Sequence, residues 1–253
     1  MNIFSYMFAI FKKEINGFFS SLTGYIVIIV FLLFNSLFMW VFPGEWNILD
    51  SGYAGLDTLF FVSPWVFMFL VPAVTMRMIA EEKRSGTIEL IYSRPITERE
   101  LIYGKYFASV CLVLLALLPG VIYYYSVYSL GDTPGNLDKG GTMGSFIGLF
   151  FLASVYASAG ILASSISDNQ VVAFILAVII CFFLFMGFDS IAYLPGLKKL
   201  DEFFIRLGIN EHYKSISRGV VDIKDIVYFI AVIVFFNEAT RFYLLSRKWK
   251  KRS

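Results

Sequence analysis

Six stretches of the chain are apolar over about the length of helix that crosses a lipid bilayer. A hydrocarbon layer of about 30 Å requires roughly 20 predominantly apolar residues in one helix. The polar and charged residues concentrate between these stretches. The pattern therefore predicts an all-α polytopic membrane protein with six transmembrane helices, over residues 24–42, 59–79, 107–128, 145–162, 171–188 and 226–245.

The first 23 residues form a separate element before the first apolar stretch. Phe, Met and Ile residues recur there at intervals of three and four, which places them on one helical face, with Lys12 and Lys13 on another. We therefore expect residues 1–23 to form an interfacial helix that buries its apolar face at the acyl boundary and offers its lysines to anionic headgroups. Gly17 and the polar stretch 20–23 argue against a simple extension of the first span.

The polar segment 80–106 between the second and third spans predicts a short helix, a stop and a new helix. Pro95 ends the helix that precedes it, because proline lacks the backbone N–H that helix continuation requires. Thr97 and Glu100 then have the spacing of a capping box, which begins the next helix. The short helix carries an apolar stripe that needs a covering surface, either from this chain or from another subunit: Ile88, Ile91 and Tyr92.

Two other regions have a helical pattern of their own. The fourth span carries small residues at spacings that allow close helix contact, within the subunit or in self-association: Ala153, Ser154, Ala157, Ser158, Gly160 and Ser164. Between the fifth and sixth spans, residues 197–219 predict short amphipathic helices in the outer interface, or dipping back into it, with Gly208 ending the first. Asp222 has the position of an N-cap for the last span.

Composition and charge agree with a membrane protein of one domain, residues 1–253. Hydrophobic residues make up 58% of the chain and charged residues 16%, against about 25% charged in ordinary soluble domains. Most Lys and Arg residues fall on one side of the predicted spans, which places both termini in the cytoplasm under the positive-inside rule. The mixed-charge segment 198–224 is an exception on the outer side.

The residues provide little support for chemistry in this chain. A single histidine, His212, excludes histidine-rich metal sites and dyads of two imidazoles, and no phosphate-binding loop occurs. We expect no catalytic residue, no metal site and no nucleic-acid partner. The one clearly intramembrane acid is Glu238, for which a charge costs about 2.5 to 3.5 kcal/mol at the membrane centre. Arg241 is its expected partner, so a structural pair is favoured over a proton or ion relay.

The run from Glu81 to Lys105 resembles the signature that follows the second span in ABC-2 type permeases, the membrane subunits of a class of ABC transporter. The Glu-x-x-x-Gly-Thr-x-Glu block is its most specific part. Nearly the whole chain shares the resemblance, and the most similar members are gliding-motility-associated permease subunits of Bacteroidetes-type bacteria, followed by copper-site-maturation permeases of nitrous oxide reductase. Further similar segments are 11–25, 164–170 and 217–222.

The resemblance implies a half-transporter of the bacterial inner membrane that pairs with itself or a sister permease. A separate ATP-binding subunit, which holds ATP and Mg, would drive the half-transporter. The process served would be export, secretion or gliding motility. An auxiliary gliding-type envelope protein would be a further partner. A coupling helix around residues 81–93 would dock on that ATPase, and the outer pieces would be short re-entrant helices. The implied coupling residues are Glu81, Glu82, Arg84, Gly86, Thr87, Glu89 and Pro95.

Two other functions remain to be compared with this one. A permease-like anchor would couple an ATPase to an envelope motility complex and move no substrate, consistent with spans that carry no charged lining. An intramembrane enzyme would need a nucleophile or a metal, and the serines of the fourth span lack a base.

Overall fold

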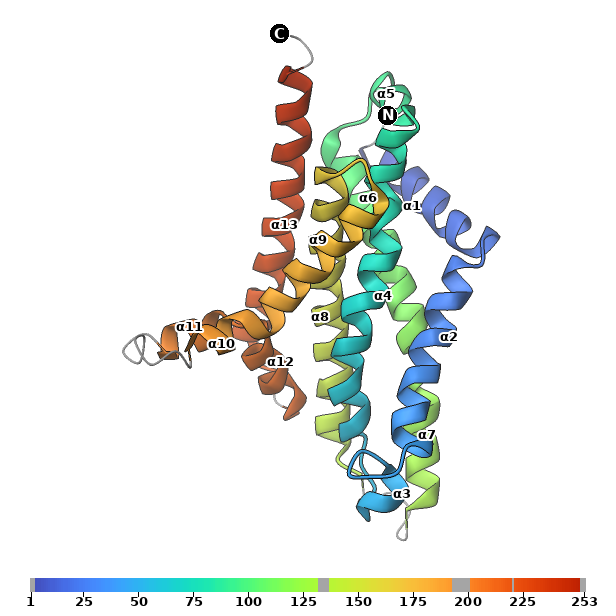
Figure 1. Cartoon of the computed structure of the whole chain (residues 1–253), viewed down its shortest axis with the longest axis vertical. Helices are drawn as coiled ribbons and strands as arrows, with labels where there is room; N and C mark the ends of the chain where they lie inside the picture. The colour runs from blue at the N-terminus through green and yellow to red at the C-terminus, as the bar shows by residue number, and fades with distance from the viewer. Residues whose placement is uncertain (1–2, 132–136, 193–200, 220, 251–253) are drawn as a thin grey trace.

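The computed structural model describes residues 3–131, 137–192, 201–219 and 221–250, and every regular element in these ranges is a helix. The helices pack side by side in an elongated bundle (Figure 1). The short helix α5 (Thr87–Tyr92) lies at one end of the long axis and α3 (Ile48–Ser51) at the other. We call these the α5 end and the α3 end.

Among the described residues, five helical stretches are long and apolar enough to cross a membrane, and each corresponds to one predicted span, the first ending one residue before the predicted 42. π-Helical turns extend two of them. The stretches consist of α2 (Thr23–Ser36) with η1 (Leu37–Val41), α4 (Asp57–Arg84), α6 (Glu98–Leu117) with α7 (Gly120–Leu130), α8 (Lys139–Ile166), and α9 (Gln170–Phe182) with η2 (Phe183–Gly187) and α10 (Phe188–Ala192).

The sixth predicted span lies within α13 (Ile223–Lys250), which runs back to the α5 end of the bundle (Figure 1). Its crossing of the membrane stays a prediction. The predicted N-cap is confirmed, because Asp222 Oδ1 accepts a hydrogen bond of 3.1 Å from the backbone N–H of Lys224.

The third span is not one continuous helix, as its apolar pattern predicted. It is divided into α6 and α7 at Leu118 and Pro119. Pro119 cannot donate a backbone hydrogen bond to the preceding turn, and a glycine follows it, so the helix stops and restarts. The apolar pattern does not reveal this break because the residues on both sides of it are apolar.

The N-terminal helix α1 (Ile3–Ser20) forms as predicted, and one side of it packs on α6 of the same chain. Its place at the membrane interface stays a prediction. A Cβ at Gly104 of α6 would lie 2.9 Å from both Met7 O and Ile10 Cγ2, so only glycine permits this approach. Phe18 is also buried, while Phe8 stays exposed on another side.

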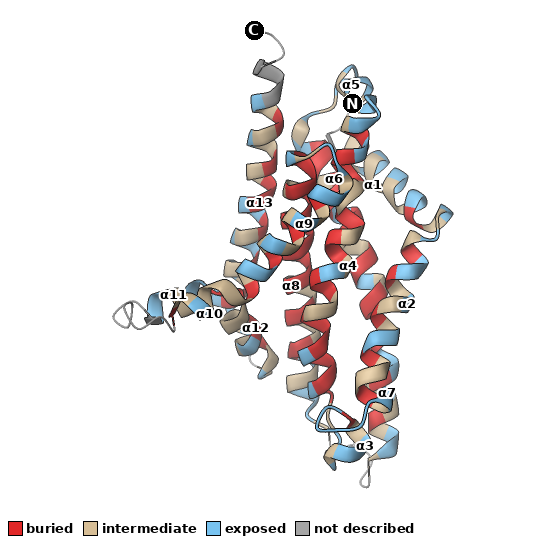
Figure 2. Ribbon diagram, in the orientation of Figure 1, coloured by how far each residue is buried: buried red, intermediate tan, exposed pale blue. Residues whose placement is uncertain are grey.

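Helix α8 lies at the centre of the bundle, and its small residues account for this position. All six small residues named above are buried inside the subunit. A Cβ at Gly160 would overlap Thr75 Oγ1 of α4, so the α8 backbone lies directly against the Thr75 side chain. Buried residues concentrate along α8 and α4 (Figure 2). Close packing within the subunit is therefore the confirmed alternative for this span.

The helices α11 (Asp201–Leu207) and α12 (Ile209–Ser217) follow α10, and α10 and α11 project sideways from the bundle (Figure 1). The predicted start of this region, residues 197–200, lies outside the described residues. Gly208 follows α11 as expected, but its φ of −75° needs no glycine. A Cβ there would lie 3.1 Å from Asp189 Oδ1, so the close approach of α10 favours glycine instead.

Candidate functional site

The predicted coupling helix around residues 81–93 is two helices in the structure. Helix α4 continues to Arg84, and α5 begins only at Thr87. Between them Gly86 has a φ of +71°, a left-handed conformation that ends α4 and that glycine adopts without strain. Glu81 and Arg84 are thus exposed on the last turn of α4 rather than on the short helix itself.

Helix α5 is fixed at both of its ends. Thr87 Oγ1 donates a 3.3 Å hydrogen bond to Glu82 O, back in the last turns of α4. After Pro95, the predicted capping box is confirmed: Glu100 N donates to Thr97 Oγ1 at 3.3 Å, and Glu100 Oε2 accepts from Thr97 N at 2.7 Å. The turns at Gly86 and Pro95 therefore bound α5, which is a short helix at this end of the bundle.

The apolar stripe of α5 is covered in part by this chain. Ile88, Ile91 and Tyr92 are half-buried, and a cleft of 470 Å³ separates α5 from α1. Ile91 lines this cleft opposite Ile10 of α1. Leu90 lines the same cleft but is 69% exposed, and Glu89 beside it is also exposed. The stripe is thus covered only in part: Ile88 packs on the core, and Ile91 faces α1 across the cleft.

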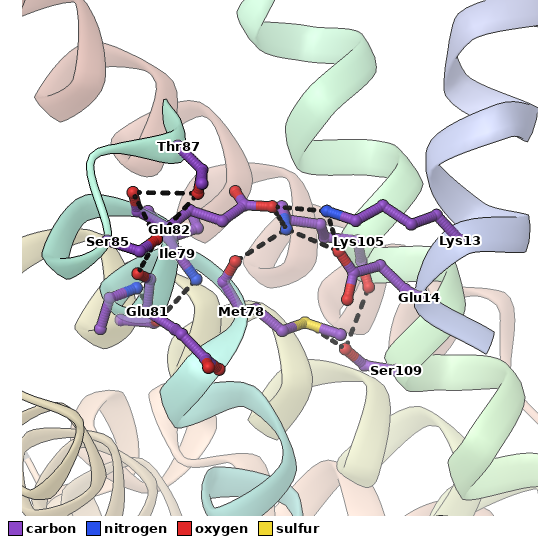
Figure 3. Close-up of polar contacts among 12 residues, drawn as sticks. Lys13, Glu14, Met78, Ile79, Glu81, Glu82, Ser85, Thr87, Lys105 and Ser109 are labelled. Carbon is purple, nitrogen blue, oxygen red and sulfur yellow. Dashed lines mark hydrogen bonds and ion pairs between the residues drawn. The ribbon is translucent and has the colours of Figure 1, made fainter. Parts of the chain in front are cut away.

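Glu82 points inward, contrary to its expected place on a docking surface. Lys105 Nζ of α6 donates to Glu82 Oε1 at 2.8 Å, to Glu14 Oε1 of α1 at 2.7 Å and to Met78 O at 2.7 Å. Lys13 Nζ reaches the same Glu82 oxygen at 3.0 Å. Figure 3 shows these side chains converging from α1, α4 and α6. We call Lys13, Glu14, Glu82 and Lys105 the ionic cluster.

Charge and hydrogen bonding are balanced in the ionic cluster. Lys105 is 1% exposed, and its ammonium group has three donors for the three acceptors that surround it. Two cations and two carboxylates face one another, so no net charge is buried. Burial lowers the pKa of Lys13, but the neighbouring Glu82 and Glu14 carboxylates outweigh this effect, so its pKa is raised. Glu82 Oε2 has no hydrogen-bond partner among the described residues.

Sequence reasoning missed the ionic cluster, although one signal for it was present. Glu14 falls on the apolar face of α1, between Phe11 and Phe18 at helical spacing. A carboxylate on such a face needs a cation from the element that covers it. The covering helix proves to be α6, and Lys105 stands next to the glycine that allows contact.

A second set of contacts fixes the last turns of α4 from the other side. Ser164 Oγ of α8 accepts hydrogen bonds of 3.0 Å from the backbone N–H groups of Ile79 and Ala80, and donates to Met76 O at 2.9 Å. Lys83 Nζ, nearly buried, donates to Ser165 O and lies 3.5 Å from Asp168 Oδ1. The end of α4 is thereby bound to α8 and to the turn after it.

The predicted pair Glu238 and Arg241 forms, with Arg241 Nη1 2.8 Å from Glu238 Oε2. A second partner was not foreseen: Arg99 Nε, in the first turn of α6, lies 3.1 Å from Glu238 Oε1. Two arginines on one carboxylate are typical of a structural ion pair, here one that joins α13 to α6. Among the described residues, no group of three His, Cys, Asp or Glu side chains is placed to hold a metal ion.

The comparisons with known proteins assign the chain to a family. The sequence model of a family described as ABC-2 family transporter protein matches residues 7–241. The chain belongs to the ABC-2 transporter family. No curated protein matches it. The match runs from α1 to α13, so it includes the ionic cluster and α5. Membership in the ABC-2 family makes the chain a transmembrane permease of an ABC transporter, and implies association with an ABC ATP-binding subunit.

Proposed function

We propose that this ABC-2 permease docks on a separate ATP-binding subunit through α5, and that ATP hydrolysis in that subunit drives its movement. The observation that carries the proposal is the presentation of α5: a short helix held at the end of the bundle, with Leu90 69% exposed. ATP and Mg would be bound by the partner. The α5 end would then face the cytoplasm of a bacterium, with the protein in the inner membrane and both termini on the cytoplasmic side.

The coupling residues divide into three roles in this proposal. Glu81, Arg84 and Glu89 are exposed and would meet charges of the ATPase. Gly86 and Pro95 shape the two turns that bound α5, and Thr87 bonds α5 to α4. Glu82 acts inside the permease, through the ionic cluster. Leu90 adds an apolar contact that a solvated helix would not expose.

A second permease, identical or a sister chain, would complete the transporter. The buried positions of α8 are filled by apolar and small side chains, which favours a path between two subunits over one inside a single subunit. The resemblance to gliding-motility-associated permeases supports a process of export, secretion or gliding motility, with an auxiliary envelope protein as a further partner.

The alternative is a membrane anchor that binds the same ATPase but moves no substrate. The tightly filled α8 leaves no path inside one subunit, so it supports the anchor if the complex contains no second permease. The two functions share the docking contact and differ in the response of the ATPase. Transported compounds stimulate ATP hydrolysis by a transporter complex in liposomes, whereas an anchored ATPase would not respond to any compound added to either side.

The docking role of α5 is tested by purification in a mild detergent. Leu90→Asp and Glu89→Lys should each reduce the co-purifying ATPase at least tenfold, measured as vanadate-sensitive ATP hydrolysis. Leu49→Asp is the matched control, because Leu49 is 67% exposed on α3 at the opposite end. Equal recovery of ATPase with all three variants, or a wild-type protein that purifies without an ATPase, would contradict the proposal.

A further inference from the structure

We propose that the ionic cluster is the joint through which a displacement of α5 reaches the spans, and that Lys105 is its positioning residue. The inference rests on the proposed function, since it requires an ATPase that moves α5. Its structural basis is independent of that function: the cluster joins α1, α4 and α6, and α5 follows Glu82 after one turn of chain.

A continuous series of contacts leads from α5 to the cluster. Thr87, the first residue of α5, donates its hydroxyl to the backbone oxygen of Glu82. The Glu82 carboxylate in turn accepts from Lys105 and Lys13. A displacement of α5 therefore acts on Glu82 directly, and through its carboxylate on two other helices.

Lys105, on α6, distributes this displacement because its three acceptors lie on two other helices. Glu14 belongs to α1, whereas Glu82 and Met78 belong to α4. The adjacent Gly104 brings α6 into direct contact with α1. Met78 also lies within the turn of α4 that Ser164 of α8 bonds, so the joint extends to the central helix.

The ionic cluster has a buried centre, Lys105, and an exposed edge, Lys13. Lys105 is buried, but the Lys13 side chain is 65% exposed, and Glu82 Oε2 is an unused acceptor. Lys13 and Glu82 line both the 470 Å³ cleft toward α5 and a polar cleft of 340 Å³ on the other side. Lys13 therefore has room to change its acceptor while Lys105 stays in place, as a moving joint requires.

Stability alone does not explain these charges. A buried ion pair is often replaced by neutral residues of similar shape without loss of stability, because removing the charges also removes their desolvation cost. Apolar packing would hold α1 on α6 equally well. Directed bonds from one ammonium group instead fix the relative positions of three helices, as a transmitting element requires.

The test uses a neutral variant that leaves no unpaired buried charge: Glu14→Gln, Glu82→Gln and Lys105→Met together. Spin labels are placed in a background with Cys111→Ala and Cys181→Ala. One label pair, at Ser93 and Tyr243, reports movement of α5 against the bundle. The second pair, at Leu49 and Tyr125, reports the α3 end, where both side chains are exposed. Distances are measured in the complex with the ATPase, before and after ATP with vanadate.

In the wild-type complex both distances should change on addition of ATP with vanadate. In the neutral variant the ATPase should still co-purify and the first pair should still respond, while the response of the second pair falls at least fivefold. The control Glu238→Gln with Arg241→Met removes an ion pair that lies off this route and should respond as wild type. Lys105→Met with Glu82→Gln is a second variant, which leaves Glu14 near Lys13.

An unreduced response of the second pair in a folded neutral variant would overturn the joint while leaving the docking role of α5 intact. A wild-type complex whose α5 moves without any change at the α3 end would overturn it equally. Failure of the ATPase to co-purify with wild type is a different result, because it overturns the proposed function and the joint with it.

Discussion

Helix α8 and the stretch that begins with α9 are consecutive, both are long enough to span a membrane, and they are buried to very different extents. In the most apolar stretch of α8, 72% of the residues are buried inside the protein, against 22% for the stretch that begins with α9. Yet α9 consists mostly of Val, Ile, Phe and Leu, whereas α8 is rich in Gly, Ala and Ser. In a membrane, small and hydroxylated residues therefore mark the protein core better than hydrophobicity does.

The largest effect on this contrast is expected from Gly160→Leu in α8. A side chain there would overlap Thr75, which is itself buried and bonded to the backbone of α4. Separating α8 from α4 should destabilise the protein by about 3 kcal/mol, the upper part of the range for overpacked cores. Unfolding in detergent, followed by denaturant titration, measures the difference.

The matched control for this variant is Gly17→Leu in α1. Nothing lies within 4 Å of a Cβ at Gly17. Leucine has the higher helix propensity, so the control should gain up to about 1 kcal/mol. Comparable losses from both variants would show that glycine content, and not contact between α8 and α4, accounts for the burial of α8.

Ser164→Ala should have the next largest effect. Its hydroxyl accepts from two backbone N–H groups of α4 and donates to Met76 O, and the substitution removes all three of these buried bonds. The expected cost is about 2 kcal/mol of unfolding free energy. Ser158→Ala is the control, because among the described residues Ser158 Oγ bonds only to Val155 O in its own helix, and its loss should cost less than about 0.5 kcal/mol. Equal effects would contradict a specific role for Ser164.

A third, smaller effect concerns Tyr156, the large residue among the small ones of α8. It is fully buried, and its hydroxyl has no hydrogen-bond partner among the described residues. Tyr156→Phe should therefore stabilise the protein by up to about 1 kcal/mol. Tyr213→Phe, which loses a 2.7 Å bond to Phe60 O, should destabilise it by about 1 kcal/mol in the same unfolding measurement. A loss of stability in Tyr156→Phe would indicate a partner for its hydroxyl, such as a buried water.

Features encoded by residues close in sequence could be predicted, since their physical cause is local. The apolar runs located the membrane-spanning helices, and Thr97 with Glu100 located the start of α6. The break at Gly86 was missed because the sequence does not show whether a glycine adopts a left-handed or a helical backbone conformation. The apolar face of α1 was likewise visible, but its periodicity does not distinguish lipid from a neighbouring helix.

The ionic cluster was beyond prediction for a different reason. Its bonds join residues that are 91 positions apart, Glu14 and Lys105, and 23 apart, Glu82 and Lys105. Which charges meet depends on the packing of α1 on α6, and that packing depends on Gly104. Glu82 could therefore be recognised as part of a motif, whereas its inward direction required the fold.

The smallest effect is expected in α9. This measurement decides whether the low burial of α9, compared with α8, reflects contact with lipid. Ile179 is 57% exposed on α9, so its side chain loses few protein contacts when shortened. Because lipid chains fill the space and are as apolar as the side chain removed, Ile179→Ala should change the unfolding free energy by less than about 0.5 kcal/mol. Leu149→Ala in α8, at a fully buried position, should cost at least about 2 kcal/mol by leaving a cavity. If Ile179→Ala proved as costly as Leu149→Ala in the isolated protein, α9 would be covered by protein rather than lipid, and a second permease would be the surface to look for.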